Sequence, residues 1–239
     1  MSKRIAIVQS SYIPWKGYFD LIASCDEFVL YDDAQYTKRD WRNRNRIKTP
    51  QGPLWLTIPV VVKGRFDQRV CDTVVSDSTW PEKHWRSIRA HYSRAPCFTE
   101  VAARLEELFL GSSSDRLSDI NRRFLVALCG MLGITTRLTW SMDYNLESGR
   151  TRKIAGICRQ AGATEYISGP SARSYLDERQ FADAGIAVTY ADYSAYPEYT
   201  QLYPPFDHYV SVIDLLVHLG ADAPQFMQSV SRGYERAGS

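Results

Sequence analysis

The sequence lacks the short motifs that mark several common enzyme classes. It contains no HExxH metalloprotease motif, no GxSxG nucleophile elbow, no P-loop and no GxGxxG dinucleotide fingerprint. Its five cysteines form no CxxC pair, and Cys129 and Cys158 lie within helix-like apolar runs. This pattern indicates buried, reduced thiols and supports neither a disulfide framework nor a thiol nucleophile.

A strong excess of one charge and long hydrophobic runs are also missing. The 29 Lys and Arg residues nearly balance 27 Asp and Glu, so the net charge of +2 does not point to nucleic acid or an anionic membrane. No stretch approaches the ~18 apolar residues of a membrane span, and the first residues, MSKRIAIVQSS, carry no signal-peptide pattern. We therefore expect a cytoplasmic protein with no membrane span.

Aromatic residues, in contrast, are plentiful. The 15 tyrosines and 6 tryptophans each pair an apolar ring with a polar tip, which suits core packing and also the walls of polar-ligand pockets. A length of 239 residues with 44% hydrophobic content is enough to bury a sizeable core. We expect a single α/β domain over residues 1–239.

Strand-like and helix-like segments alternate at both ends of the chain. Residues 4–8 and 27–31 predict strands that flank a helix over 15–24, which is the βαβ pattern. Strands and helices alternate again at 136–140, 151–161, 165–168, 187–190 and 209–219. This order predicts a mostly parallel, Rossmann-like sheet with helices on both faces. A β-rich insertion is expected at about 36–75 and a helical segment at about 80–132.

Polar and aromatic side chains follow each predicted strand. In an open parallel sheet, ligands bind at the carboxyl ends of the strands, near the point where strand order reverses. The stretches found there are QSSYIPWKGY, DDAQYTKRDWRNRN, SMDYN, SGPSAR and ADYSAYPEYTQ. Ordinary turns would be less crowded, so these loops favour an active-site cleft. Substrate-binding residues predicted from them include Gln9, Tyr12, Trp15, Lys16, Gln35, Asp192, Tyr193, Tyr199 and Gln201.

The stretch SGPSARSYLD gives the clearest local prediction. Pro170 fits the first position of a helix that follows a strand end, and N–H groups at such a helix start bind phosphate or carboxylate. Arg173 would add guanidinium donors to that site. The predicted contacts in this stretch are Ser168, Gly169, Ser171 and Tyr175. An ordinary capped helix is the alternative interpretation.

The stretch KRDWRNRNRIK gathers basic residues around Trp41. As a strand it would place Arg42 and Arg44 on one face and Asn43 on the other. Such a face could hold a nucleotide, a phosphate-bearing sugar or an RNA backbone. A solvated basic edge that prevents aggregation is the equal alternative.

Three further residues are candidates for catalysis. Asp32 and Asp33 end a predicted strand, where carboxylates could orient an amine, bind Mg²⁺ with a phosphate or simply start a turn. His84, on a predicted helix, is the best general-base candidate because histidine titrates near neutrality, although a hydrogen-bonded structural histidine is the commoner outcome. No metal ligand set is predicted, and the cofactor stays unidentified, with a nucleotide or Mg²⁺ compatible with these residues.

Taken together, these stretches resemble the WbqC-like protein family. The resembling pieces, IVQSSYIPWKGYFDLI, FVLYDDAQYTKRDWRNRNRI, LWLTIPV, ICRQAGATEYISGPSARSYLD, YPEYTQLYPPF and VSVIDLLVHLG, run from the first strand to near residue 220. One departure is Ser10, where proline is common in the family. The resemblance implies a place in bacterial surface-polysaccharide (O-antigen) or other biosynthetic clusters. It assigns no catalytic residues.

The activity that the resemblance implies is amide formation by a transferase. Glycine or another aminoacyl group would pass to an amino or carboxyl sugar, or to a related small-molecule or carrier-bound acceptor. Asp32 or Asp33 would receive the glycine ammonium, His84 would deprotonate the attacking amine, and amides near Gly169 would stabilise an oxyanion, with Arg173 beside them. Expected partners are a nucleotide sugar or carrier-bound acceptor, glycine or activated glycine, and proteins of the same cluster. Nucleic acid is expected only as an aminoacyl-tRNA donor.

Two other interpretations stay open. A strand followed by PWKGYFDLI, together with the late ISGPSAR, is weakly similar to nucleotidyltransferase-type α/β folds, although the first loop lacks their histidines. A non-catalytic sugar- or carrier-binding module of a biosynthetic complex would also need aromatic-rich loops. Pyrophosphate release from ATP would identify the former, and binding without turnover the latter.

Overall fold

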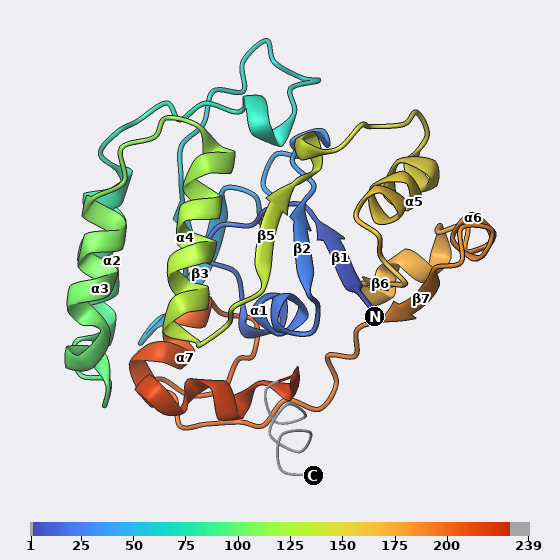
Figure 1. The fold of residues 1–239 in the computed structure, drawn as a ribbon. Helices are drawn as coiled ribbons and strands as arrows, with labels where there is room; N and C mark the ends of the chain where they lie inside the picture. Colours follow the sequence, from blue (N-terminus) through green and yellow to red (C-terminus); the bar gives the residue numbers. More distant parts are fainter. Residues whose placement is uncertain (1, 230–239) are drawn as a thin grey trace.

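A parallel sheet forms the centre of the protein. The computed structural model describes residues 2–229, and within them the sheet has the strand order β5-β2-β1-β6-β7. The strands are β1 (Arg4–Val8), β2 (Glu27–Leu30), β5 (Arg137–Trp140), β6 (Glu165–Ser168) and β7 (Ala187–Tyr190). Every neighbouring pair is parallel, and helices lie on both faces (Figure 1). The predicted α/β, Rossmann-like architecture is confirmed.

The short apolar runs of the central strands β1 and β2 form strands because they are buried on both faces of the sheet. Ile7 lies in the core beneath α5 (Arg150–Gln160). Ala6, the preceding residue, points to the opposite core, where it packs near Phe19 of α1 (Lys16–Ala23). Each face of the sheet therefore has its own hydrophobic cluster, and burial of apolar area at about 25 cal/mol per Å² stabilises both.

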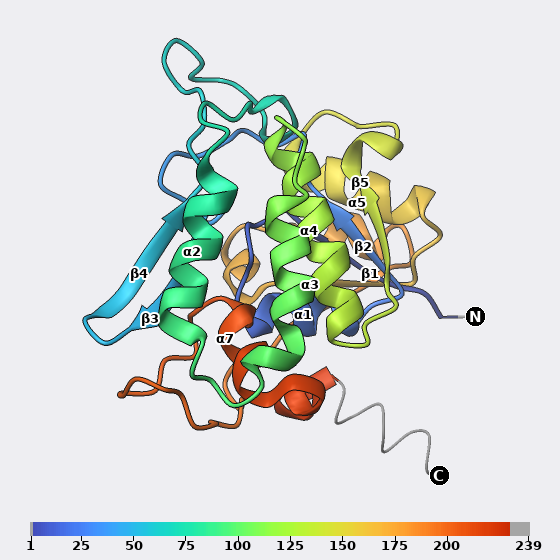
Figure 2. The same ribbon diagram turned by 90° about the vertical axis from the view of Figure 1, so that its left-hand side faces the viewer.

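A layer of helices packs beside the sheet (Figure 2). It consists of α2 (Trp80–Tyr92), α3 (Phe98–Leu110), α4 (Leu117–Met131) and α7 (Val212–Leu219). Helix α3 contacts both α2 and α7, and Phe109 of α3 meets Phe124 of α4 edge-on with ring centroids 4.9 Å apart. Aromatic residues at helical spacing thus fill the space between these helices.

An antiparallel hairpin stands apart from the main sheet. It joins β3 (Arg44–Thr49) to β4 (Gly52–Thr57), beside α2 in Figure 2. Gly52 has a φ of 107°, a conformation that side chains other than hydrogen disfavour, and this permits the tight turn. Ile47 is fully buried, whereas Trp55 on the partner strand is 41% exposed. The hairpin therefore has one core face and one aromatic outer face.

The segment after β6 differs from the expected helix. It begins as a 3₁₀ turn, Pro170–Ser174, and only Arg179–Ala182 (α6) is α-helical. Other 3₁₀ turns lie at Val70–Asp72, Ser141–Asp143 and Gly220–Phe226.

The strand order reverses at β1. The chain proceeds from β1 through β2 to β5 on one side, and then returns to β6 and β7 on the other. The switch point thus lies between β1 and β6, which pair directly, with Ala6 beside Ile167. In sheets of this kind the ligand crevice lies at the carboxyl ends of the strands next to this point.

Candidate functional site

An ion pair lies at the carboxyl edge beside the switch point. The Nζ atom of Lys153, in the first turn of α5, donates to Oδ2 of Asp33 at 2.7 Å, and the Ser141 hydroxyl donates to Oδ1 at 2.6 Å. Its hydrogen bond to Asp33 raises the pKa of Lys153 above the ordinary value. The Lys153 side chain is 25% exposed and that of Asp33 only 3%. A ligand would therefore meet the ammonium group, while the carboxylate holds it in position.

Two arginines lie near this pair without acidic partners. The guanidinium of Arg150 lies 3.7 Å from the ring centroid of Tyr175, and that of Arg173 lies 4.5 Å from the centroid of Tyr190. Within residues 2–229 neither guanidinium forms an ion pair with a carboxylate. Stacking leaves their N–H edges available, so these arginines can bind a phosphate or carboxylate.

The first turn of α5 adds to this positive charge. Arg150, Arg152 and Lys153 all lie there, at the end where the helix dipole disfavours cations. We call Lys153, Arg150 and Arg173 the basic cluster. Sequence analysis identified Arg173 and missed the other two, although basic residues at the start of a predicted helix were a readable signal.

Asp32 holds the loop after β1. It is fully buried, and it accepts hydrogen bonds from the backbone N–H of Ser10 at 2.8 Å and from the Ser118 hydroxyl. Burial raises its pKa above the ordinary value. Asn121 donates to the hydroxyl of Ser10 at 2.9 Å and extends the same network. With these partners Asp32 fixes the loop after β1.

The arginines of the hairpin region brace the backbone. Arg42 Nη1 donates to the carbonyl oxygens of Gln9 at 2.9 Å and Ser10 at 3.3 Å. Arg44 donates to the Arg39 carbonyl and stacks 4.2 Å from the ring centroid of Trp55. The predicted face of phosphate-binding arginines is therefore largely occupied by contacts within the chain.

Asn43 and Gln35 also contact backbone groups. Asn43 is buried, and its amide donates to the Ile58 carbonyl at 2.8 Å. The side-chain amide of Gln35 donates to the Phe66 carbonyl at 3.0 Å. The backbone carbonyl of Gln35 accepts a long, 3.4 Å bond from the side-chain amide of Gln9. Gln9 and Gln35 thus remain at the carboxyl edge, where they link the loops after β1 and β2.

His84 and Tyr12 lie together in the helical core. The Tyr12 hydroxyl is 2.9 Å from Nδ1 of His84, and both rings pack against Trp80. Burial lowers the pKa of His84 to about 4, so the ring is neutral near pH 7. Only 6% of His84 is exposed. We therefore assign His84 and Tyr12 no role in the reaction proposed below.

Lys16 lies among aromatic rings and is almost completely buried. Its Nζ atom donates to the Pro197 carbonyl at 3.0 Å and lies 5.0 and 5.4 Å from the ring centroids of Tyr196 and Tyr199. Burial lowers its pKa to about 8. These contacts attach α1 to the segment that follows β7.

Tyr199 and Gln201 belong to a buried network around Asp214. The Tyr199 hydroxyl donates to Asp214 Oδ1 at 2.7 Å, Gln201 donates to the same oxygen at 2.9 Å, and the Tyr92 hydroxyl donates to Oδ2 at 2.7 Å. Asp214 is fully buried. No signal in the sequence pointed to Asp214, which lies inside an apolar helix. The predicted substrate contacts Tyr199 and Gln201 instead hold this buried carboxylate.

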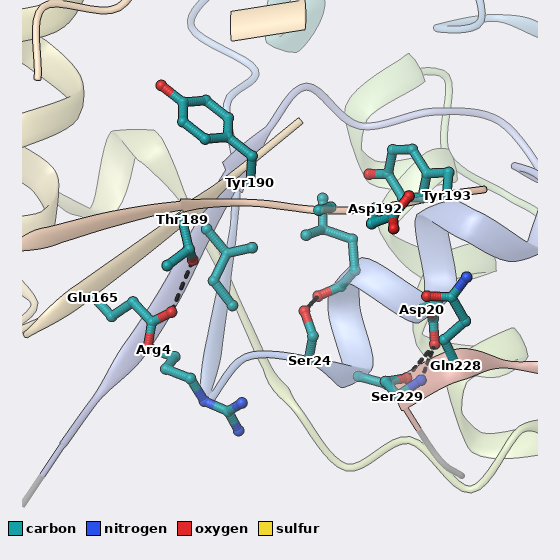
Figure 3. Close-up of a pocket in the computed structure, with 14 residues that line it drawn as sticks. Arg4, Asp20, Ser24, Glu165, Thr189, Tyr190, Asp192, Tyr193, Gln228 and Ser229 are labelled. Carbon is teal, nitrogen blue, oxygen red and sulfur yellow. Dashed lines mark hydrogen bonds between the residues drawn. The ribbon is translucent and has the colours of Figure 1, made fainter. Parts of the chain in front are cut away.

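Asp192 and Tyr193 line a cavity of about 480 Å³ on the α1 side of β6 and β7. Thr189 donates to Glu165 at 2.8 Å on one side of this cavity, and Ser229 donates to Asp20 on the other (Figure 3). The residues that line it include Arg4 and Glu165, which are the first residues of β1 and β6. The cavity thus runs along the sheet face to the carboxyl end of β7, where its lining includes Tyr190, the residue on which Arg173 stacks.

The other predicted contacts lie at the carboxyl edge itself. Ser168 is buried, and its hydroxyl donates to that of Tyr166 at 3.2 Å. Gly169, Ser171 and Tyr175 follow it, and Ser171 and Tyr175 are exposed beside the basic cluster. Trp15, at the start of α1, lines a small cavity next to the end of β1.

Neither a metal site nor a membrane span is evident in the described part of the chain. Across residues 2–229, no three His, Cys, Asp or Glu side chains are arranged to hold a metal ion. No helix in that range has the length and apolar character needed to cross a membrane.

Comparison with known proteins identifies relatives of the whole chain. A family model described as "WbqC-like protein family" matches residues 9–226. An uncharacterized protein of Mycobacterium tuberculosis (strain ATCC 25618 / H37Rv), Rv1507c, is 54% identical over 226 residues, which cover 95% of this chain and 98% of that protein. No solved structure matches the chain.

Proposed function

The chain belongs to the WbqC-like protein family, and we propose that it is a biosynthetic transferase that forms an amide bond. In this proposal, glycine or another aminoacyl group passes to an amino or carboxyl sugar, or to a related carrier-bound acceptor. The reaction takes place at the carboxyl edge between β1 and β6. The observation that carries the proposal is the basic cluster beside the switch point, where within residues 2–229 Lys153 pairs with Asp33 and the two arginines form no ion pair.

The chemistry requires a place for negative charge. A neutral amine attacks an activated carbonyl carbon, the N–C bond forms, and the C–O bond to a phosphate leaving group breaks with its electron pair on oxygen. The amine loses its proton to solvent at the open edge. Charge develops first on the carbonyl oxygen and then on the departing phosphate, and fixed donors stabilise both.

Lys153 is the group best placed to supply this stabilisation. Asp33 and Ser141 fix its ammonium group through a chain of short hydrogen bonds, so little reorganisation is needed when charge develops. Arg150 and Arg173, each stacked on a tyrosine, offer planar donors for the phosphate. Asp33 acts as a positioning residue in this scheme.

The test is a transfer assay with purified protein. Labelled glycine with ATP and Mg²⁺ is offered together with UDP-glucuronic acid or a UDP-linked amino sugar. Mass spectrometry should detect an acceptor that has gained one glycyl residue. Lys153→Ala should lower the rate by about 10²-fold, as loss of one charge-stabilising donor commonly does. Arg104→Ala, an exposed arginine on α3, is the matched control and should keep the wild-type rate.

A second candidate is a nucleotide-using enzyme. Numbered along the chain, the five parallel strands described here have the spatial order 3-2-1-4-5, as in nucleotide-binding α/β folds. Release of pyrophosphate from ATP, without transfer of glycine, would favour this candidate. Binding of a nucleotide sugar without turnover of any donor would contradict both.

A further inference from the structure

A second, smaller cavity lies where β1 ends and α1 begins. Its volume is about 270 Å³, at the lower end of small-molecule sites, which leaves room for one ring and not for a dinucleotide. Val8, the last residue of β1, lies in its wall, and β1 pairs with β6. The cavity and the basic cluster therefore flank the same strand ends.

Aromatic rings form the walls of this cavity. Trp15 and Tyr209 pack together with ring centroids 5.3 Å apart, and Trp41, 40% exposed, contributes another wall. Tyr193 and Tyr196 contact Trp15 edge-on at 5.3 and 5.8 Å, which fixes the orientation of its indole. Rigid aromatic walls of this kind bind flat, partly apolar ring faces.

One polar group in the cavity wall, the hydroxyl of Ser11, has no hydrogen-bond partner among the described residues. Only 4% of Ser11 is exposed. The hydroxyl oxygen itself is not sealed off from the cavity, so a ligand bound there can form a hydrogen bond with it. Arg42 lines the same cavity, and its buried Nε atom has no hydrogen-bond partner within the described chain.

The lining also excludes several kinds of ligand. The lining residues include no carboxylate and do include the positively charged Arg42, so the cavity is unsuited to a metal cation. The charge of Arg42 is offset by Asp40, whose Oδ2 atom lies 3.6 Å from Arg42 Nε. A phosphate would therefore bind better at the basic cluster than in this cavity. The side-chain amide of Asn45 donates to the Tyr12 carbonyl and accepts from the Arg46 N–H, and these two bonds fix its orientation in the wall.

From these observations we propose that the cavity binds one hydroxyl-bearing sugar ring, a pyranose. The apolar C–H face of the sugar stacks on Trp41 or Trp15, and its hydroxyls bond to Ser11 and Arg42. The inference rests on the proposed function in one respect: this ring would be the sugar of the acceptor.

The test measures sugar binding without requiring turnover. Saturation-transfer NMR with UDP-N-acetylglucosamine, UDP-glucose, UDP-glucuronic acid and dTDP-glucose should show transfer to the pyranose protons of at least one probe. Its affinity is then compared among variants. Trp41→Ala should weaken binding about tenfold, and Ser11→Ala about fivefold.

Trp55→Ala is the matched control. Trp55 is 41% exposed and its ring centroid lies 5.3 Å from that of Trp41, but it does not line the cavity. This variant should bind within twofold of the wild type. Circular dichroism spectra of all three variants should match that of the wild type, since Trp41 and Trp55 are surface residues and Ser11→Ala removes only an unpaired hydroxyl.

Three results would overturn the proposal. One is absence of saturation transfer from all four sugars. Another is equal weakening by Trp41→Ala and Trp55→Ala. The last is UDP binding as tightly as its sugar conjugates with the same dependence on Trp41, which would assign the cavity to the nucleobase. Sugar binding that depends on Trp41, found without amide formation, would support this inference while rejecting the proposed reaction.

Discussion

The indole of Trp15 occupies the space in which a side chain at position 17 would stand. A Cβ atom placed on Gly17 would lie 2.8 Å from Cε2 of that indole and closer still to other ring atoms. The two residues therefore pack as a unit at the start of α1. Glycine at position 17 is what allows the Trp15 ring to fold back over the helix and face the cavity beside β1.

Gly17→Ala should consequently displace the Trp15 ring. Because the indole is held by Tyr193, Tyr196 and Tyr209, it has little room to move, and overpacking of this kind typically costs 1–3 kcal/mol, so we expect a loss of about 2 kcal/mol. Urea unfolding would measure the change. Trp fluorescence should also shift as the ring environment changes.

Gly130→Ala provides the matched control for this substitution. Gly130 lies in α4, and a Cβ there would meet no atom within 4 Å. Replacement of a helical glycine by alanine should stabilise the protein by about 0.5–1 kcal/mol. Equal effects of the two substitutions would contradict the packing argument.

The fold was predictable from the sequence because its strands and helices follow simple periods. The strands 4–8, 165–168 and 187–190 were predicted with the bounds observed, and helices α2, α3 and α4 lie in the predicted helical segment at about 80–132. Burial on both faces makes the central strand β1 a short apolar run, and a packed helix face repeats every 3.6 residues. Both patterns can be recognised in the local sequence without knowing which elements pack together.

The directions of loop side chains were not predictable in this way. Tyr12 and Trp15 lie three residues apart, yet Tyr12 enters the helical core and Trp15 faces a cavity. Asp32 and Asp33 are adjacent, yet one bonds to Ser10 and the other to Lys153. Loops have no repeating pattern of side-chain directions. The direction of each side chain therefore depends on long-range contacts that the local sequence does not specify.

Asp33→Asn should weaken the hold on Lys153 without removing its charge. The hydrogen bond to Asp33 raises the pKa of Lys153, so its loss moves that pKa down toward the ordinary 10.5. The protonated form would then be lost at lower pH, and anion binding should fail earlier on the alkaline side. Pyrophosphate affinity measured against pH by calorimetry would show this shift.

Lys153→Ala tests the same assignment from the other direction. In this variant the affinity for pyrophosphate should no longer fall at alkaline pH through loss of the Lys153 proton, because the titrating ammonium group is absent. Lys153→Arg, which keeps the charge, should retain most of the affinity at neutral pH. An unchanged profile in Asp33→Asn would mean that Asp33 does not position Lys153.

The network around Asp214 should be sensitive to loss of single hydroxyl groups. Tyr199→Phe removes a hydrogen bond to a fully buried carboxylate, which should cost about 1.5–3 kcal/mol. Asp214→Ala leaves Tyr92, Tyr199 and Gln201 without their acceptor, and a larger loss of about 3–5 kcal/mol is expected. Tyr209→Phe, at a residue 60% exposed, is the control and should be neutral in urea unfolding.

His84 should make the protein less stable in mild acid. Burial lowers its folded-state pKa from 6.5 to about 4, so the unfolded chain binds a proton that the folded protein excludes. Stability from this residue is complete above pH 6.5 and is lost as pH falls toward 4. Between pH 7 and pH 5 the free energy of unfolding should fall by about 2 kcal/mol from this group alone.

The variant H84Q isolates that contribution from other titrating groups. Glutamine keeps a polar partner for the Tyr12 hydroxyl but does not titrate, so its pH dependence should be smaller than that of the wild type by the same 2 kcal/mol or so. Urea unfolding at pH 7 and pH 5 gives both values. Because the comparison is between pH values within each protein, a general loss of stability in H84Q does not affect it. Parallel pH dependence in the two proteins would show that His84 is accessible to protons in the folded state, and would restore it as a candidate general base.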